Sequence, residues 1–207
     1  MKHSQELMEL LREKERRVKL KEYEEDFSSF AIDQIQIITK DAQQGFIPFS
    51  FNECQKRITE ALDKQIRETG KVRAIILKAR QQGISTYCAG RVFWKTYFQQ
   101  HSRSVVMAHD SATSDALFTM SKNLIRNMKG DLTPKELTSN AKEIKILSPS
   151  YADRDAIGSY RLYTAGSPEA GRGTTPTILH ASEVAFWQHD EKILSGCLLY
   201  TSPSPRD

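Results

Sequence analysis

The sequence predicts an α/β domain in which a mostly parallel sheet is flanked by helices. A charged N-terminal helix and a short β-hairpin are expected before this domain. Apolar runs of strand length alternate with helical patterns between residues 72 and 181, as they do in strand–helix–strand units. A short glycine-bearing segment, residues 78–86, joins the first of these runs to the helix that follows it.

Length and composition set wide bounds on function. The 207 residues suffice for one domain with its own core, and the formal net charge of +4 permits a nucleic-acid partner without requiring one. No apolar run is long enough to span a bilayer, and the start shows no signal-peptide pattern. Cys54, Cys88 and Cys197 have neither metal-site nor disulfide spacing, which favours a reducing, cytoplasmic setting.

The first 29 residues are expected to form a charged helical segment. A helix is predicted over residues 5–26, where twelve of the fifteen positions from Arg12 to Asp26 are charged. Its apolar stripe is thin, so we expect a solvated helix that docks lightly on the body or on a partner. The alternative, a coiled-coil arm, requires a longer and more regular stripe.

The elements that follow are predicted in chain order. The segment 32–39 alternates and is rich in isoleucine, which predicts a strand centred on 35–38. This strand and one that begins at 46–47 form the hairpin, around a turn at 41–45. A helix over 53–68 begins after Asn52 as N-cap and ends at Gly70. The later strands are expected at residues 72–77, 104–108, 144–147, 158–164 and 177–181. Helices are expected at residues 86–99 and 112–128, and loops at residues 129–140 and 165–176.

Two parts of these elements bear on the core and on the loops. The aromatic and apolar residues of the 86–99 helix are expected in the core; they are Tyr87, Val92, Phe93, Trp94, Tyr97 and Phe98. His109 and Asp110 close the strand at 104–108. Arg172, between two glycines in the 165–176 loop, either contacts phosphate or DNA or braces the loop.

The last eleven residues, 197–207, continue no pattern and match the in-frame translation of a sequencing-library transposon adapter. We therefore leave them out of the predicted domain, which is taken as residues 30–196. A natural reading frame would then be interrupted near Gly196. A fragment cut there is expected to bind nucleotide weakly and to be a poor or inactive enzyme.

The segment Lys-Ala-Arg-Gln-Gln-Gly-Ile-Ser-Thr, residues 78–86, has the layout of a phosphate-binding loop. Gly83 allows the backbone to approach a ligand, and the N–H groups of the new helix face an anion. Ser85 falls where such loops place the hydroxyl that binds the magnesium of the nucleotide. The lysine that usually follows the glycine is replaced by Ile84. These features predict a nucleotide-binding site.

Hydrolysis also requires an acidic group at the end of a neighbouring strand. The strand at 177–181 is followed by Ser182 and Glu183, which supply one. Glu183 is expected to align, or accept a proton from, the water that attacks the γ-phosphate. Taken alone, Glu183 would be read as a surface glutamate after a strand.

Residues 78–86 and the segment His-Ala-Ser-Glu-Val-Ala-Phe-Trp, residues 180–187, together resemble the large terminase subunit of tailed bacteriophages. That family packages viral DNA with an N-terminal ATPase domain and a C-terminal nuclease domain. Residues 48–55 are similar to its adenine-recognition motif, and residues 158–173 resemble the segment that leads into its second acidic motif. The resemblance covers about residues 30–196.

The resemblance implies a role for each motif residue. Gln55 would read the adenine edge, Arg80 would act as a cis arginine finger, and Lys78 would contact phosphate in the ordinary way. The nucleotide-binding set comprises Gln55, Lys78, Ala79, Arg80, Gln81, Gln82, Gly83, Ile84, Ser85 and Thr86. Which of Lys78 and Arg80 meets the γ-phosphate stays open. Magnesium would be held by Ser85 and, through water, by Ser182 and Glu183. Ser182 is a departure, because many such motors have aspartate there.

The resemblance implies a P-loop NTPase of the RecA-like (ASCE) type that uses ATP and Mg²⁺. The implied function is ATP hydrolysis that drives double-stranded DNA into a procapsid, with no nuclease site in this chain. The implied partners are viral DNA, the portal protein, the small terminase subunit and further copies in a ring, with no membrane. The implied location is the cytoplasm of the infected bacterium, transiently at the portal and outside the mature virion. Two alternatives are a helicase-like P-loop ATPase and a non-catalytic DNA-binding fragment. The mild net charge and the lack of a basic stripe disfavour the second.

Overall fold

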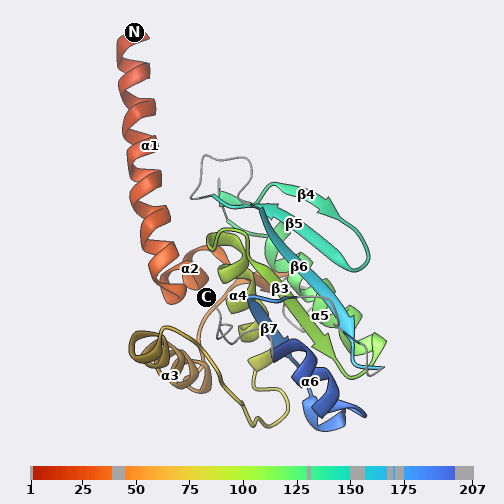
Figure 1. The fold of residues 1–207 in the computed structure, drawn as a ribbon. Coiled ribbons are helices and arrows are strands. Elements are labelled where there is room, and N and C mark those ends of the chain that lie inside the picture. Colours follow the sequence, from red (N-terminus) through yellow and green to blue (C-terminus); the bar gives the residue numbers. More distant parts are fainter. Residues whose placement is uncertain are drawn as a thin grey trace, which may run out of the picture.

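The structure is a computed structural model that describes residues 2–38, 45–129, 132–149, 157–166, 170 and 175–198 (Figure 1). The helices are α1 (Lys2–Glu25), α2 (Phe27–Gln34), α3 (Glu53–Thr69), α4 (Ile84–Phe98), α5 (Ser111–Arg126), the short 3-10 helix η2 (Val184–Phe186) and α6 (Asp190–Leu198). The strands are β1 (Gln36–Ile38), β2 (Phe46–Pro48), β3 (Arg103–Ala108), β4 (Glu136–Ser139), β5 (Glu143–Leu147), β6 (Ile157–Thr164) and β7 (Ile178–Ala181).

The prediction of a mostly parallel P-loop sheet is wrong, because the five-stranded sheet is mixed. Its strand order is β4-β5-β6-β3-β7. β3 pairs in parallel with β6 and β7, whereas β5 pairs antiparallel with β4 and β6. The cause lies in residues 129–140, which were expected to be a loop. Asn140 accepts hydrogen bonds from the N–H groups of Lys142 and Glu143, so a tight turn joins β4 to β5 as an antiparallel hairpin.

The strand predicted at residues 72–77 is also absent from the structure, where this segment has no regular structure. Ile75 and Leu77 are fully exposed. The side chain of Gln65 in α3 bonds both the N–H and the C=O of Arg73, at 2.8 and 3.1 Å. These local bonds occupy backbone groups that a sheet ladder would use. β7, rather than residues 72–77, is therefore the last strand of this sheet.

The strand β3 is buried on both faces from Ser104 onward, which explains the apolar run Val105–Ala108. Val106 and Ala108 pack in the main core, on the face covered by α4 and α5. Val105 and Met107 point to the other face, where they join Trp187 and Ile193 of the η2–α6 segment in a second cluster. The middle of the sheet therefore lies between two helical layers.

The main core is built on the aromatic face of α4, as predicted. Tyr87, Phe93, Trp94, Tyr97 and Phe98 are each at most 3% exposed. They contact aromatic residues of α2. This helix was not predicted from the sequence, because the first hairpin strand was extended back to residue 32. The carboxylate of Asp26 starts α2 by accepting the N–H groups of two serines, and Phe27, Phe30 and Ala31 of α2 are buried in the core. The predicted hairpin is confirmed as the β1–β2 pair, although its turn lies outside the described residues.

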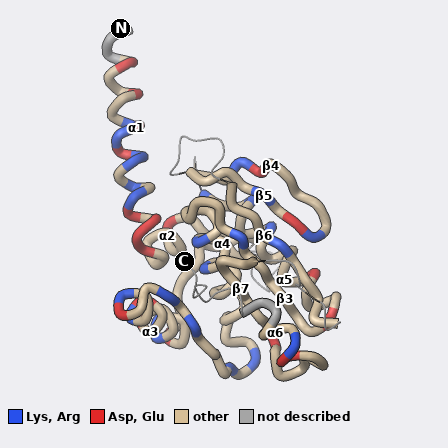
Figure 2. The backbone as a smooth tube through the Cα atoms, in the orientation of Figure 1, with Lys and Arg blue, Asp and Glu red and all other residues tan. Residues whose placement is uncertain are grey.

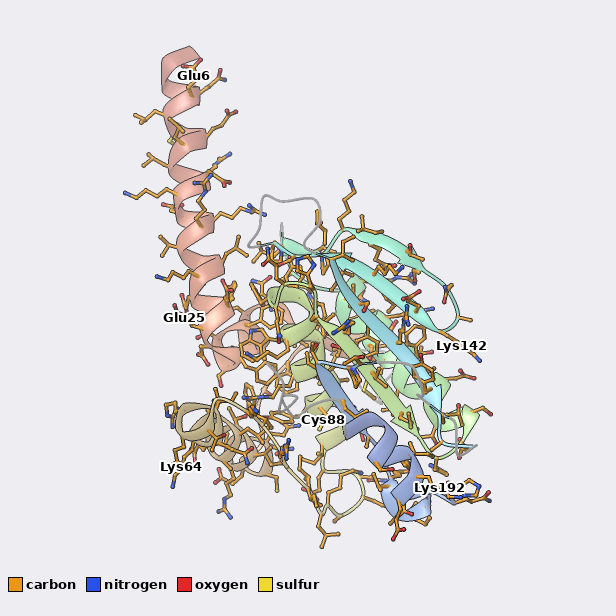
Figure 3. All side chains as sticks on the ribbon, in the orientation of Figure 1. Glu6, Glu25, Lys64, Cys88, Lys142 and Lys192 are labelled. Atoms are coloured by element: carbon orange, nitrogen blue, oxygen red, sulfur yellow. The ribbon has the colours of Figure 1, made fainter. Side chains whose placement is uncertain are left out.

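The predicted N-terminal helix is confirmed as α1, which projects away from the body (Figure 1). Basic and acidic residues alternate along it, and its side chains radiate into open space over most of its length (Figures 2 and 3). Only its last turns dock: Leu20 and Tyr23 are buried, and the Trp94 indole N–H donates to the Tyr23 carbonyl at 2.6 Å. Residues 199–207 of the expected adapter tail lie outside the described part, and Cys197 and Leu198 end α6.

Candidate functional site

The N-terminus of α3 holds the glycine-bearing loop by two side chains. Asn52 and Gln55 form a reciprocal capping box, as the predicted N-cap requires. Beyond the cap, Asn52 Nδ2 donates to the Gln82 carbonyl at 3.0 Å, and Gln55 Nε2 donates to the Gly83 carbonyl at 2.9 Å. Gln55 is only 4% exposed. These contacts fix the loop against the first turn of α3.

The loop backbone is left-handed at two positions. Gly83 has φ of +66°, and Gln81, a residue with a side chain, has φ of +63°. A Cβ atom added to Gly83 would lie 2.9 Å from Gln55 Nε2, so both the backbone angle and the space require glycine here. Gln81 adopts a conformation that non-glycine residues avoid, which surrounding contacts must hold in place.

The first turn of α4 presents backbone N–H groups without a side-chain cap. Gly83 is the N-cap and has no side chain to cap the helix, and the helical ladder begins with the Tyr87 N–H bonded to the Gly83 carbonyl. The N–H groups of Ile84, Ser85 and Thr86 precede that ladder. Such a helix start favours a bound anion, and the Ser85 hydroxyl is half-buried in the same turn.

The segment that leads into this helix start is positively charged. Residues 71–83 contain four basic residues and no acidic one, and all four are exposed. Burial raises the pKa of the Cys88 thiol to about 11, and the nearby charge of Lys78 opposes this shift. Cys88 lies in α4 (Figure 3). Lys78 and Arg80 are thus both available to an anion, and the choice between them stays open.

The acidic element follows β7, as expected from the sequence. Met107 of β3 lies opposite Ala181 in the parallel register, and the Ser182 N–H continues the ladder to the Met107 carbonyl at 2.8 Å. Ser182 is buried, and its carbonyl accepts the Trp187 indole N–H at 3.1 Å. Glu183 then turns left-handed, with φ of +56°, and its side chain is partly exposed. The backbone therefore turns sharply just where the carboxylate is presented.

His109 belongs to this site, although the sequence reading treated it only as the end of a strand. It follows β3 directly, and its Nδ1 lies 3.0 Å from Glu183 Oε2. Its Nε2 lies 2.6 Å from Asp110 Oδ2. Phe186 packs against the imidazole with ring centroids 5.7 Å apart. The parallel pairing of β3 with β7 was the signal, since residues that follow neighbouring parallel strands meet at one edge of the sheet.

Asp110 anchors this contact to α5. Its Oδ1 accepts the Thr113 N–H at 2.6 Å as the N-cap of that helix. This backbone hydrogen bond is the main reason that the pKa of Asp110 lies below its usual range. The carboxylate therefore stays charged beside the imidazole.

The glycine loop and the acidic element lie at the same end of the molecule. The last turn of α4 meets the start of β3, because the Ser102 hydroxyl donates to the Thr96 carbonyl at 2.9 Å. From there α4 runs back along the sheet for fifteen residues, about 22 Å, which matches the roughly 20 Å length of a six-residue strand. Its first turn thus returns to the carboxyl ends of β3 and β7, in agreement with Figure 1.

Other predicted site residues have mixed outcomes. Both polar atoms of the Gln55 amide are bonded to backbone, so reading an adenine edge would require it to exchange a contact; the adenine role stays a prediction. Ala79 and Thr86 lie in the loop and in the first turn of α4. Arg172 lies outside the described residues.

The described residues fit a magnesium ion only together with phosphate. They contain no group of three or more His, Cys, Asp or Glu side chains that could hold a metal by themselves. Mg²⁺ typically takes one or two protein oxygens, several waters and the phosphates of its substrate. The half-buried Ser85 hydroxyl and the Glu183 carboxylate suit that mode of binding.

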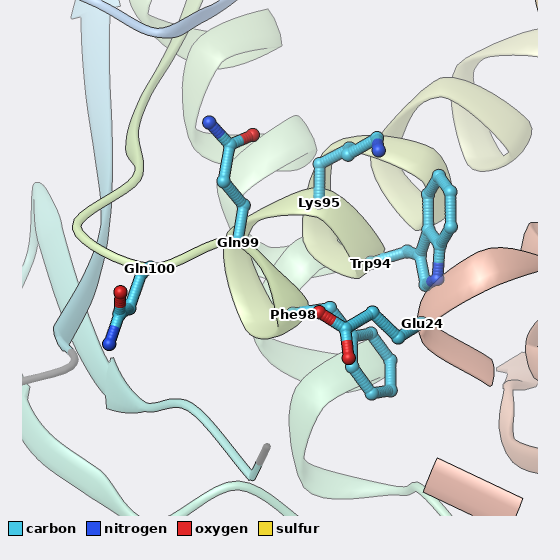
Figure 4. Close-up of a pocket in the computed structure, with 6 residues that line it drawn as sticks. All are labelled: Glu24, Trp94, Lys95, Phe98, Gln99 and Gln100. Atoms are coloured by element: carbon cyan, nitrogen blue, oxygen red, sulfur yellow. The ribbon is translucent and has the colours of Figure 1, made fainter. Parts of the chain in front are cut away.

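The cavities lie away from this end of the molecule. One of about 340 Å³ lies beside the last turns of α1 and α4 and is lined by Glu24, Trp94, Lys95, Phe98, Gln99 and Gln100 (Figure 4). Another of about 500 Å³ lies along α1 and includes Tyr23, Gln34 and Leu132. Neither of these two cavities contains a residue of the predicted site.

His180, in the strand that precedes the acidic element, should make the free energy of unfolding depend on pH. Its Nδ1 is buried without a hydrogen-bond partner among the described residues, and desolvation lowers the pKa of the ring from 6.5 to about 4. Between these values the unfolded chain binds a proton that the folded chain does not. The free energy of unfolding should therefore fall by up to about 3 kcal/mol as pH drops from 6.5 to 4, with no further loss from His180 below 4.

Urea unfolding at pH 7, 6, 5 and 4 measures this loss. His180→Leu removes the titrating ring and should flatten the profile over this window. An unchanged profile in that variant would assign the acid sensitivity to other groups.

Comparison with known proteins assigns no family. No protein-family model matches the chain, and no curated protein matches it either. Across the described residues, every helix is too short or too polar to cross a membrane.

Proposed function

We propose that this chain is an ATP-hydrolysing motor domain of the kind found in the large terminase subunit of tailed bacteriophages. The observation that carries the proposal is the placement of two strained backbone positions, Gln81 and Glu183, at one end of the molecule. Gln81 belongs to the glycine loop that leads into α4, and Glu183 presents the carboxylate after β7. Strain of this kind persists at functional sites, where the surrounding contacts hold it.

The chemistry assigned to each part follows from its donors and charges. The first-turn N–H groups of α4, together with Lys78 and Arg80, bind the triphosphate. Bound Mg²⁺ neutralises charge on the phosphates, and the Ser85 hydroxyl is its expected protein ligand. Glu183 aligns the attacking water, and Arg80 stabilises the charge that develops on the γ-phosphate.

The proposed cargo and setting rest on the motif resemblance. Hydrolysis would drive double-stranded DNA into a procapsid, in the cytoplasm of an infected bacterium and transiently at the portal. The proposed partners are the portal protein, the small terminase subunit and further copies arranged as a ring. The exposed basic residues between α3 and α4, visible in Figure 2, support contact with phosphate groups.

Nucleotide binding by the glycine loop is the direct test of this function. A fluorescent ATP analogue with Mg²⁺ should bind the protein, and Gly83→Ala should weaken that binding about tenfold. The added Cβ would force the loop away from Gln55 and is strained at φ of +66°. Equilibrium fluorescence titration measures the affinity. Gly166→Ala is the matched control, because a Cβ at Gly166 meets nothing within 4 Å.

Thiol labelling provides a second readout at the same place. Cys54 is exposed and lies 3.7 Å from Gln82 Oε1, so bound nucleotide should slow its alkylation. Cys88 is half-buried with a raised pKa and should react slowly with or without nucleotide. Absence of any nucleotide binding in the unsubstituted protein would refute the proposed function.

A further inference from the structure

The carboxylate of Glu183 lies next to the imidazole of His109. Glu183 follows β7 and His109 follows the neighbouring parallel strand β3, so the register alone brings the two side chains together. The measured separation of His109 Nδ1 and Glu183 Oε2 is 3.0 Å. The two side chains are 27% and 39% exposed, so the contact is only partly screened by water.

The imidazole is itself fixed from two sides. Its Nε2 lies 2.6 Å from Asp110 Oδ2, and the other oxygen of Asp110 caps α5. The ring of Phe186, three residues after Glu183, packs against the imidazole. A chain of contacts therefore runs from the start of a helix through a carboxylate and an imidazole to Glu183.

The ring nitrogen that faces Glu183 has no competing partner. His109 Nδ1 is buried, and no hydrogen bond to it is formed among the described residues. The Nδ1–Oε2 pair is close enough for a hydrogen bond but is not yet aligned for one. Catalytic hydrogen bonds are often misaligned in a ligand-free enzyme and tighten once the substrate binds.

We propose that His109 is a positioning residue for Glu183, which holds the carboxylate in the orientation that aligns the attacking water. This inference rests on the proposed ATP hydrolysis. His109 touches neither the nucleotide nor the water in this role. It acts only through Glu183, whose left-handed backbone presents the carboxylate next to the imidazole.

Kinetics separate positioning from a merely structural role. In the full-length protein, His109→Ala should lower kcat for ATP by about 10- to 100-fold and leave KM within about twofold, because only the placement of the carboxylate is lost. His109→Asn should restore most of kcat, since its amide nitrogen can occupy the place of Nδ1. An unchanged kcat in His109→Ala, or an asparagine variant as slow as the alanine variant, would overturn the inference.

Imidazole nitrogen NMR tests the contact without requiring turnover. Glu183→Gln should shift the Nδ1 resonance of His109, whereas Glu191→Gln on the exposed face of α6 should leave it in place. A shift without any ATP hydrolysis would mean that the proposed function has failed, and this role with it. Hydrolysis without a shift would mean that the positioning inference alone has failed.

Discussion

Arg80→Ala is expected to slow ATP turnover by about 10³- to 10⁵-fold, the range seen when an arginine that stabilises transferring phosphate is removed. Arg80 is exposed in the loop just before the strained Gln81, so its guanidinium can reach a phosphate bound at the start of α4. Its effect should appear mainly in kcat, because the charge that it stabilises develops in the transition state. Steady-state phosphate release in the full-length protein measures the change.

Two matched variants make this result specific. Arg73→Ala removes an exposed charge from the same basic segment, at a residue whose backbone is tied to Gln65, and should leave turnover unchanged. Lys78→Ala should weaken ATP binding more than it slows the chemical step. A normal rate in Arg80→Ala would move the transition-state role to Lys78 or to a neighbouring subunit.

Glu183→Gln should lower ATP turnover by about 10²- to 10⁴-fold while ATP binding stays intact, because the amide has the size of the carboxylate but accepts no proton. The substitution keeps the side-chain length beside His109 and leaves the Ser182 backbone contacts to β3 and Trp187 in place. Single-turnover hydrolysis and fluorescent-nucleotide titration measure the two properties separately.

Glu191→Gln is the control for Glu183→Gln, since Glu191 is an exposed carboxylate in the first turn of α6. It should leave both binding and turnover unchanged. Retained turnover in Glu183→Gln would remove Glu183 from the mechanism and leave the left-handed turn after β7 without a catalytic role.

The local elements were predictable where the signal is short-range. The helix after Asn52 begins and ends where its N-cap and Gly70 predict, and the aromatic face of α4 forms the core as its spacing indicates. The chain between residues 78 and 86 is a loop that leads into a helix, with glycine at the left-handed position. Each of these features depends on residues within a few positions of one another.

The errors concern the partner with which each segment forms its backbone hydrogen bonds. Residues 72–77 have the composition of a buried strand, but that outcome requires a pairing partner and cover on both faces. In the structure the Gln65 side chain binds the backbone at Arg73 instead. Residues 136–139 were predicted to be loop, yet a turn at Asn140 pairs them with β5. Both outcomes depend on which groups are nearby in space.

The candidate site, like the fold, has parts that follow from local sequence and parts that depend on tertiary contacts. The glycine loop and the acidic residue after an apolar strand follow from the sequence alone, because their chemistry depends on residue type and local spacing. The contacts of Gln55 with Gly83 and of His109 with Glu183 become evident only in the folded chain. Those contacts depend on strand register and helix placement, since parallel pairing of β3 with β7 brings together residues that are 74 positions apart in the chain. This pairing places the imidazole of His109 next to the carboxylate of Glu183.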